Sequence, residues 1–177
     1  MKGIVLNRKI HYWAGAIIAI PGLVLLASGL LLQSKKHWSW VQPTEYRGTG
    51  TVPVIELSQL LQSVRHAPEL GVGSWDDVNR IDVRPGRGVA KVWLHSGYEV
   101  QVDLGTGRIM HTAYRRSDVI ESIHDGSFFG GDWVKLGVFL PTGATLLLLW
   151  GTGLWMWWFT FANKRRVRLR KRQAATH

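Results

Sequence analysis

Two long apolar segments dominate the pattern of hydrophobic and polar positions along the chain. Residues 10–34 and residues 136–163 contain no Lys, Arg, Asp or Glu over 25 and 28 positions. A helix needs about 20 residues to cross the hydrocarbon core of a bilayer. A helix at the surface of a soluble core keeps one polar face, which neither segment has. The pattern therefore predicts two transmembrane helices, and Pro21 and Pro141 are expected to kink them.

The stretch between these segments has the short helical and alternating patterns of apolar residues that are typical of a small folded domain. Apolar residues at positions 57, 60, 61 and 64 have the spacing of one helical face. Strand-like runs follow at 78–84, 89–94 and 98–104, with a short last strand expected at 108–110. In the third run apolar residues alternate with Glu99, Gln101 and Asp103, which predicts a strand buried on one face only. The fold class predicted is membrane α+β, with two transmembrane helices flanking one small helix-on-antiparallel-sheet domain.

The net charge of +10 is concentrated next to the apolar segments. Residues 1–9 and 164–177 hold ten basic residues and no acidic residue, whereas the remaining 12 bases and 12 acids cancel. Short ends rich in Lys and Arg stay on the cytoplasmic side of a membrane. We therefore expect both termini on the cytoplasmic side and the central domain on the outer side of the membrane. In a Gram-negative bacterium these are the two sides of the inner membrane, and the central domain is periplasmic. This topology explains the charge, so no nucleic-acid partner is expected.

The basic tail has a second expected role at the membrane surface. Clusters of Lys and Arg next to a transmembrane helix attract anionic lipids. The residues expected to contact lipid headgroups are Lys164, Arg165, Arg166, Arg168, Arg170, Lys171 and Arg172.

These patterns divide the chain into seven predicted segments. They are a cytoplasmic N-terminus (1–9), transmembrane helix 1 (10–34), a linker (35–43), the periplasmic domain (44–116), an amphipathic segment that leads back into the membrane (117–131), transmembrane helix 2 (132–160) and a basic cytoplasmic tail (161–177). The first apolar segment is longer than the core of a signal peptide, so we expect an uncleaved anchor.

Small residues recur every seven positions in both apolar segments. They are Gly15, Gly22 and Gly29 in the first, and Gly137, Ala144 and Gly151 in the second. Seven residues make about two helical turns, so each set forms one stripe along its helix. Such stripes let helix backbones approach closely in lipid. We expect the two helices to pack together, or against another subunit or a second copy of the chain.

Five short motifs resemble one family of membrane proteins. IHYWAG (10–15) opens the first apolar segment and SGL (28–30) closes it. In YEVQVDLGTGRI (98–109) an alternating strand reaches an Asp, a Thr-Gly turn and one more strand. IHDGSFFG (123–130) precedes the second apolar segment, and TGLWMWW (152–158) lies in the later part of that segment. Their order and spacing resemble the PepSY-associated transmembrane proteins over roughly residues 8–166, and the chain is identified as a short, two-helix member.

The resemblance implies two kinds of function. Larger PepSY membrane proteins are associated with iron uptake, and some resemble reductases that carry electrons across the membrane to a ferric siderophore. The haems of those proteins are bound by His residues of membrane helices. PepSY domains are also likened to protease propeptides, which implies inhibition of an extracytoplasmic protease.

Three histidines are therefore candidate haem ligands. His11 lies on the glycine stripe of the first helix, His37 lies beyond its outer end, and His124 precedes the second helix. His11 and His37 are 26 residues apart, about 39 Å along a helix, so they cannot share one haem. His37 and His124 could share one, whereas His11 would pair only with a His of a partner chain, and a haem on each side would give a transmembrane electron path. The alternative interpretation is that these residues are polar anchors at the membrane boundary.

Other chemistry in the sequence is sparse. The chain has no Cys, no His-Glu-x-x-His pair and no Gly-x-Ser-x-Gly motif, so no thiol enzyme, zincin protease or serine hydrolase is indicated. The expected function is a non-catalytic accessory or binding subunit of a membrane assembly, without cofactor or metal. Its expected partners are membrane lipids and other membrane subunits or a second copy of the chain. The alternatives are a haem b electron-transfer protein linked to siderophore reduction and an inhibitor of an extracytoplasmic protease.

Overall fold

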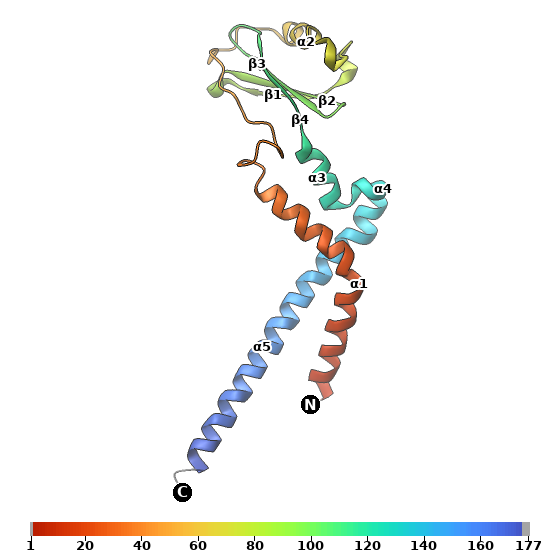
Figure 1. The fold of residues 1–177 in the computed structure, drawn as a ribbon, viewed down its shortest axis with the longest axis vertical. Coiled ribbons are helices and arrows are strands. Elements are labelled where there is room, and N and C mark those ends of the chain that lie inside the picture. Colours follow the sequence, from red (N-terminus) through yellow and green to blue (C-terminus); the bar gives the residue numbers. More distant parts are fainter. Residues whose placement is uncertain (1, 175–177) are drawn as a thin grey trace. The chain divides into compact units, whose positions relative to one another are not determined.

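The chain folds into two compact units (Figure 1). The computed structural model describes the backbone of residues 2–174 and the side chains of residues 5–167. The helix unit comprises the chain up to residue 29 and from residue 122 onward, and the sheet unit comprises Leu30–Glu121.

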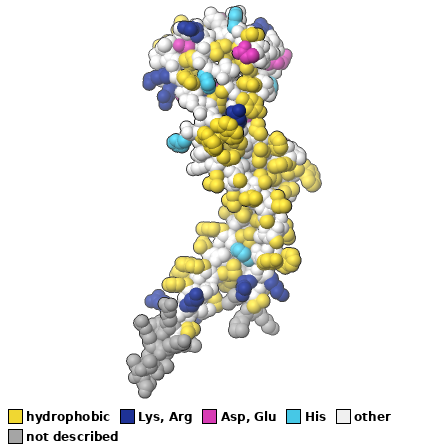
Figure 2. All heavy atoms as spheres, in the orientation of Figure 1, with side chains coloured by type: hydrophobic (Ala, Val, Ile, Leu, Met, Phe, Trp, Pro, Cys, Tyr) yellow, Lys and Arg dark blue, Asp and Glu magenta, His cyan; other side chains and the backbone are white. Residues whose placement is uncertain are grey.

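The helix unit is built mainly from α1 (Lys2–Gln33), α4 (Ser127–Val134), a π-helical turn η4 (Lys135–Phe139) and α5 (Leu140–Ala174). Two stretches, Val5–Gln33 and Ser127–Val167, are long and apolar enough to cross a membrane. Large apolar side chains such as Ile17, Ile20 and Leu147 are more than 70 % exposed, which is the surface expected to face lipid. Figure 2 shows this apolar cover, with Lys and Arg side chains gathered at the ends of α1 and α5 near the termini.

The start of α5 is irregular in a way that differs from the expected proline kink. Pro141 lies in the first turn of α5, directly after the π-helical turn η4. Proline has no N–H for the helix ladder, and a π turn is one place where a helix accommodates such a loss. The hydroxyls of Thr142 and Thr145 donate to the carbonyls of Val138 and Pro141, at 2.7 and 2.8 Å. These bonds give the carbonyl oxygens of the turn additional partners.

A glycine sets the turn between α3 (Arg116–Asp125) and α4. Gly126 has a φ of 85°, and a Cβ there would lie 2.3 Å from the ring of Phe139. Both the left-handed backbone and the close ring require glycine. Beside it, hydrogen bonds from Lys135 and Ser127 lower the pKa of Asp125 to about 2. This turn fixes the end of α3 and so the position of the neighbouring His124.

The sheet unit contains a four-stranded antiparallel sheet in the order β1-β2-β3-β4. The strands are β1 (Val78–Arg84), β2 (Val89–Leu94), β3 (Tyr98–Asp103) and β4 (Ile109–Tyr114). Helix α2 (Leu57–Arg65) covers one face, where Leu60 and Val64 pack into a core with Val92, Val100 and Val102. Strand β4 continues past the short strand expected at 108–110 because it pairs with β3 as far as Tyr98. The predicted membrane α+β fold class is confirmed.

The second face of the sheet is also buried, which corrects the expectation of a strand buried on one face only. Glu99, Gln101 and Asp103 are 0, 0 and 5 % exposed. The segment 41–50 lies over this face, where the backbone N–H of Tyr46 donates to Gln101 Oε1 at 2.8 Å. Alternation along a strand predicts which side chains share a face, but it does not predict whether another segment covers that face.

Candidate functional site

His11 of α1 contacts the other long helix of its unit. Its Nδ1 lies 3.3 Å from Oγ1 of Thr152 on α5. The next residue is Gly153, and a Cβ built there would lie 3.8 Å from His11 Cε1, at an ordinary contact distance. The partly buried imidazole is therefore held between two helices with one ring nitrogen engaged.

His124, near the end of α3, contacts α1 in the same manner. Its Nδ1 lies 3.0 Å from Ser28 Oγ. The next residue is again a glycine, and a Cβ on Gly29 would lie 3.3 Å from His124 Cε1. Each of these two imidazoles thus faces a hydroxyl followed by a glycine, on a helix far away in sequence.

An open groove lies beside His11, between α1 and α5. It has a volume of about 950 Å³, and its lining includes His11, Trp155 and Phe159. Arg8 and Lys164 bring two positive charges to the same groove. Apolar rings, an imidazole and two cations together suit a flat or elongated apolar ligand that carries acidic groups.

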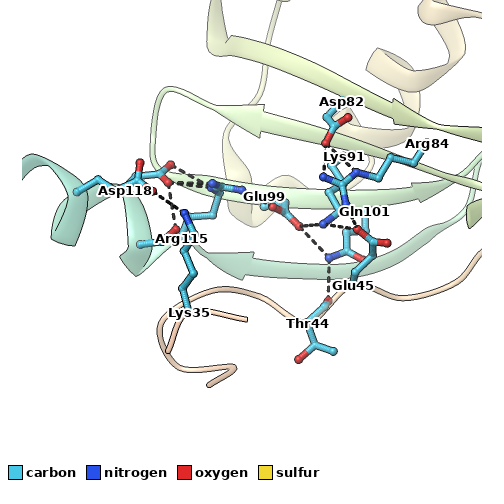
Figure 3. A network of polar contacts seen from close by, with 12 residues as sticks. Lys35, Thr44, Glu45, Asp82, Arg84, Lys91, Glu99, Gln101, Arg115 and Asp118 are labelled. Atoms are coloured by element: carbon cyan, nitrogen blue, oxygen red, sulfur yellow. Dashed lines mark hydrogen bonds and ion pairs between the residues drawn. The ribbon is translucent and has the colours of Figure 1, made fainter. Parts of the chain in front are cut away.

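The sheet unit gathers charged side chains under the segment 41–50 (Figure 3). Arg115 donates to one carboxylate oxygen of Glu99 at 2.6 Å and also pairs with Asp118 at 2.9 Å. Gln101 donates to the other oxygen of Glu99 at 2.8 Å, and Lys91 Nζ lies 3.7 Å from it. Lys91, Glu99 and Arg115 are all buried. Loss of Glu99 would leave the two buried cations with only their more exposed partners, Glu45 and Asp118.

Glu45 connects the segment 41–50, the covering segment, to the sheet through ion pairs. Its carboxylate pairs with Lys91 at 2.8 Å and with Arg84 of β1. Burial raises the pKa of Glu45, but the hydrogen bond and charge of Lys91, together with Arg84 and Arg87, outweigh this effect and lower it. The carboxylate therefore stays charged and holds the segment in place.

Asp103 fastens the end of the covering segment. It accepts hydrogen bonds from the Thr49 hydroxyl at 2.6 Å, from the Thr49 and Gly50 backbone N–H groups at 3.2 and 3.3 Å, and from the Gly105 N–H at 2.7 Å. Burial raises the pKa of Asp103, but these hydrogen bonds outweigh the burial and lower it to about 2. The chain passes very closely here, since a Cβ on Gly48 would lie 2.0 Å from the Gly88 carbonyl oxygen.

The glycine stripes behave differently on the two helices. Cβ atoms built on Gly15, Gly22 and Gly29 would lie 3.3–3.9 Å from Leu149, Leu146 and His124 of the same unit. In the second stripe, Gly137 lies in η4, whereas Ala144 and Gly151 lie on α5. Ala144 is exposed, and a Cβ on Gly137 or Gly151 would meet no described atom outside its own helix backbone within 4 Å. Within the described part of the chain only the first stripe packs. Packing of the second stripe against another subunit or a second copy stays a prediction.

The remaining predicted site residues are placed as follows. His37 is an exposed residue of the sheet unit, and its pairing with His124 stays a prediction because the two histidines belong to different units. Lys164, Arg165 and Arg166 are exposed on α5, which continues through the basic segment. The side chains of Arg168, Arg170, Lys171 and Arg172 lie outside the described residues. The lipid contacts of the tail therefore stay a prediction.

Ser28 and Thr152 are the site residues that sequence reasoning missed. The tripeptides Ser28-Gly-Leu and Thr152-Gly-Leu mark the ends of both apolar segments, and their repetition was the available signal. Among the described residues no group of three or more His, Cys, Asp or Glu could hold a metal ion. A haem needs only one or two axial ligands from the protein, because the porphyrin supplies the others.

Comparison with known proteins agrees with the fold and the motifs. The chain matches the family described as the PepSY-associated TM region over residues 2–174, nearly its whole length, which confirms the resemblance. No curated protein and no solved structure matches it significantly. With two candidate membrane helices and a sheet unit between them in sequence, the chain is a membrane protein that belongs to the PepSY-associated TM region family.

Proposed function

We propose that this membrane protein binds haem b at His11 and at His124 and carries electrons across the bilayer. The observation that carries the proposal is the shared geometry of the two imidazoles, each with Nδ1 beside a hydroxyl. A His that binds a metal commonly uses its other ring nitrogen in such a bond, which fixes the ring. Nε2 is then the nitrogen left to bind iron.

The groove beside His11 supports this proposal independently. Its aromatic walls and its volume of about 950 Å³ fit a flat macrocycle. Arg8 and Lys164 offer charge partners for two propionates. Met156 lines the same groove, and Met with His is a known pair of axial haem ligands.

The two imidazoles are spaced to serve opposite sides of a membrane. His124 contacts Ser28, which follows His11 by 17 residues of α1, or about 25 Å of helix. The hydrocarbon core of a bilayer is about 30 Å thick. Bound haem b would supply a one-electron iron couple at each end, and the proposed role in iron uptake rests on the resemblance to siderophore-linked members of the family.

A visible spectrum tests the proposal. The full chain, produced in haem-replete cells and purified in mild detergent, should show a Soret band. His11→Ala and His124→Ala should each remove part of it, and the double variant should remove it entirely. His66→Ala and His95→Ala are matched controls on the exposed surface of the sheet unit and should retain the wild-type band. A colourless wild-type protein that also takes up no added haemin overturns the proposal.

A second candidate function is a non-catalytic accessory subunit that packs through α5. The observation in its favour is the second stripe of small residues, with Gly137 in η4 and Ala144 and Gly151 on α5, which contacts no other described part of the chain closely. The chain has no native Cys, so single cysteines can report contacts. Gly151→Cys should form a cross-linked dimer, or a cross-link to a co-expressed subunit, in the membrane. Gly22→Cys, which lies beside Leu146, is the control that should not, and equal behaviour of the two variants contradicts this role.

A further inference from the structure

The two histidines of the helix unit form a reciprocal arrangement. The sequence Ser-Gly-Leu at 28–30 of α1 faces His124, and the sequence Thr-Gly-Leu at 152–154 of α5 faces His11. Helix α1 therefore supplies one imidazole, His11, and one hydroxyl-glycine pair, Ser28-Gly29. The part of the unit from residue 122 onward supplies the other imidazole and the other pair, and each imidazole contacts the pair of the opposite part. Two independent sites with the same chemistry indicate a common task for the hydroxyls.

The position of each hydroxyl hydrogen follows from the distances. Ser28 Oγ lies 2.5 Å from the carbonyl oxygen of Val24, and Thr152 Oγ1 lies 2.9 Å from that of Leu148. A carbonyl oxygen carries no hydrogen, so an oxygen pair this close needs the hydroxyl hydrogen between its members. In both sites the bond to the helix carbonyl is also shorter than the contact with the imidazole, at 3.0 Å for Ser28 and 3.3 Å for Thr152.

A hydroxyl has one hydrogen to donate and two lone pairs that can accept. Because the hydrogen is directed at the helix carbonyl, the oxygen can only accept from the imidazole. The Nδ1 atoms of His11 and His124 must then carry the ring hydrogen, and Nε2 keeps its lone pair. This is the opposite of the tautomer that free neutral histidine prefers in water, so the protein imposes it.

We infer that Ser28 and Thr152 are positioning residues that hold His124 and His11 as Nδ1–H tautomers, with the Nε2 lone pair available to a metal centre. The use of that lone pair rests on the proposed haem function, whereas the tautomers themselves do not require bound haem. Gly29 and Gly153 lie next to the Cε1 atoms of His124 and His11, and a Cβ on Gly29 would come within 3.3 Å of His124 Cε1, which is closer than ordinary contact.

The tautomers can be read directly in the haem-free protein. The full chain, with ¹⁵N-labelled histidine and in detergent at about pH 8, well above the pKa of free histidine, is examined by long-range ¹H–¹⁵N correlation NMR. The spin systems of the two histidines are assigned by their loss in His11→Gln and His124→Gln. We expect a protonated Nδ1 and an unprotonated Nε2 at both positions.

Variants test whether the hydroxyls are the cause. Thr152→Val should move His11 toward the Nε2–H tautomer, and Ser28→Ala should do the same for His124. Thr152→Ser keeps the hydroxyl and should keep the Nδ1–H tautomer. Thr145→Val is the matched control, because the Thr145 hydroxyl also donates to a helix carbonyl, that of Pro141 at 2.8 Å, but makes no hydrogen bond to an imidazole of the described residues. This variant should leave both histidines unchanged.

The outcomes separate this inference from the proposed function. Nε2–H histidine at either position in the wild type overturns the inference, as does an unchanged tautomer in Thr152→Val and Ser28→Ala. The expected tautomers in a protein that never binds haem would sustain the inference and overturn only the proposed function. If haem binds, loss of a hydroxyl should weaken its affinity by about 10- to 100-fold, the usual effect of removing a partner of a ligating His.

Discussion

The sheet unit and the helix unit use polar residues in opposite ways. In the sheet unit the buried carboxylates of Glu99 and Asp103 accept bonds from their own chain. In the helix unit the imidazole of His11 has one nitrogen engaged and lines a groove of about 950 Å³. Polar groups that saturate one another hold a structure together, whereas groups with spare bonding capacity beside a groove can hold a ligand. This difference underlies our proposal that the sheet unit supplies stability and that the helix unit binds a ligand.

The largest effect on stability is expected from the centre of the charged network. Glu99→Gln removes the carboxylate that Lys91 and Arg115 share and leaves them only the more exposed Glu45 and Asp118. The free energy of unfolding of the sheet unit should therefore fall by on the order of 3 kcal/mol, the lower end of the cost of breaking a buried ion pair. Hydrogen exchange of the β2 and β3 peptides in the full chain measures the loss. Glu121→Gln is the control, because Glu121 and its partner Lys35 are 53 and 37 % exposed, and it should cost less than about 1 kcal/mol. Equal losses of stability in the two variants would contradict the expected difference between buried and surface charges.

A smaller effect is expected from Asp103, and it should depend on pH. Its pKa is lowered from 3.8 to about 2 in the folded protein, which corresponds to about 2 kcal/mol of stability. This stability is fully present above about pH 4 and is lost as pH falls through the folded pKa near 2.

Unfolding of the full chain followed between pH 6 and pH 2 measures this dependence. Asp103→Asn should cost about 2 kcal/mol at neutral pH and should flatten the curve between pH 4 and pH 2. A variant that keeps the full acid dependence of the wild type would show that the hydrogen bonds from Thr49, Gly50 and Gly105 are not its source.

A larger side chain should destabilise the helix unit when it replaces a glycine of the first stripe, but not when it replaces a glycine of the second stripe. Gly22→Leu inserts a side chain against Leu146, whose Cδ2 lies 3.7 Å from a Cβ at this position, and should destabilise the helix pair by on the order of 1–2 kcal/mol. Gly151→Leu meets open space and should leave the stability of the isolated chain unchanged. Thermal unfolding in detergent compares the two variants, and a larger loss for Gly151→Leu would reverse the assigned packing faces.

The smallest effect on stability is expected at the groove, where binding should change instead. Arg8→Gln and Lys164→Gln remove exposed charges, so unfolding should shift by no more than about 0.5 kcal/mol. Retention of the proposed haem during purification should nevertheless decrease, because its propionates would lose their charge partners. Unchanged haem retention in the double variant would show that these two cations do not contribute to binding.

The sequence predicted the elements whose signals are local. Two long apolar segments, the helical spacing from 57 to 64 and the turn glycines each report on their own stretch of chain, and the structure contains the corresponding helices and hairpins. The burial of Glu99 and Gln101 could not be predicted this way, because it depends on a distant segment that crosses the sheet. The roles of Ser28 and Thr152 depend on which faces two helices turn toward each other. The periodicity of a single helical segment does not specify the face that its neighbour contacts.

The amount of haem b per chain tests the central claim most directly. A pyridine haemochrome assay on the full chain from haem-replete cells should find a stoichiometric amount of haem b in the wild type and none in the His11→Ala/His124→Ala double variant. A haem-free wild type, or a double variant that keeps its haem, would contradict the assignment of binding to the helix unit.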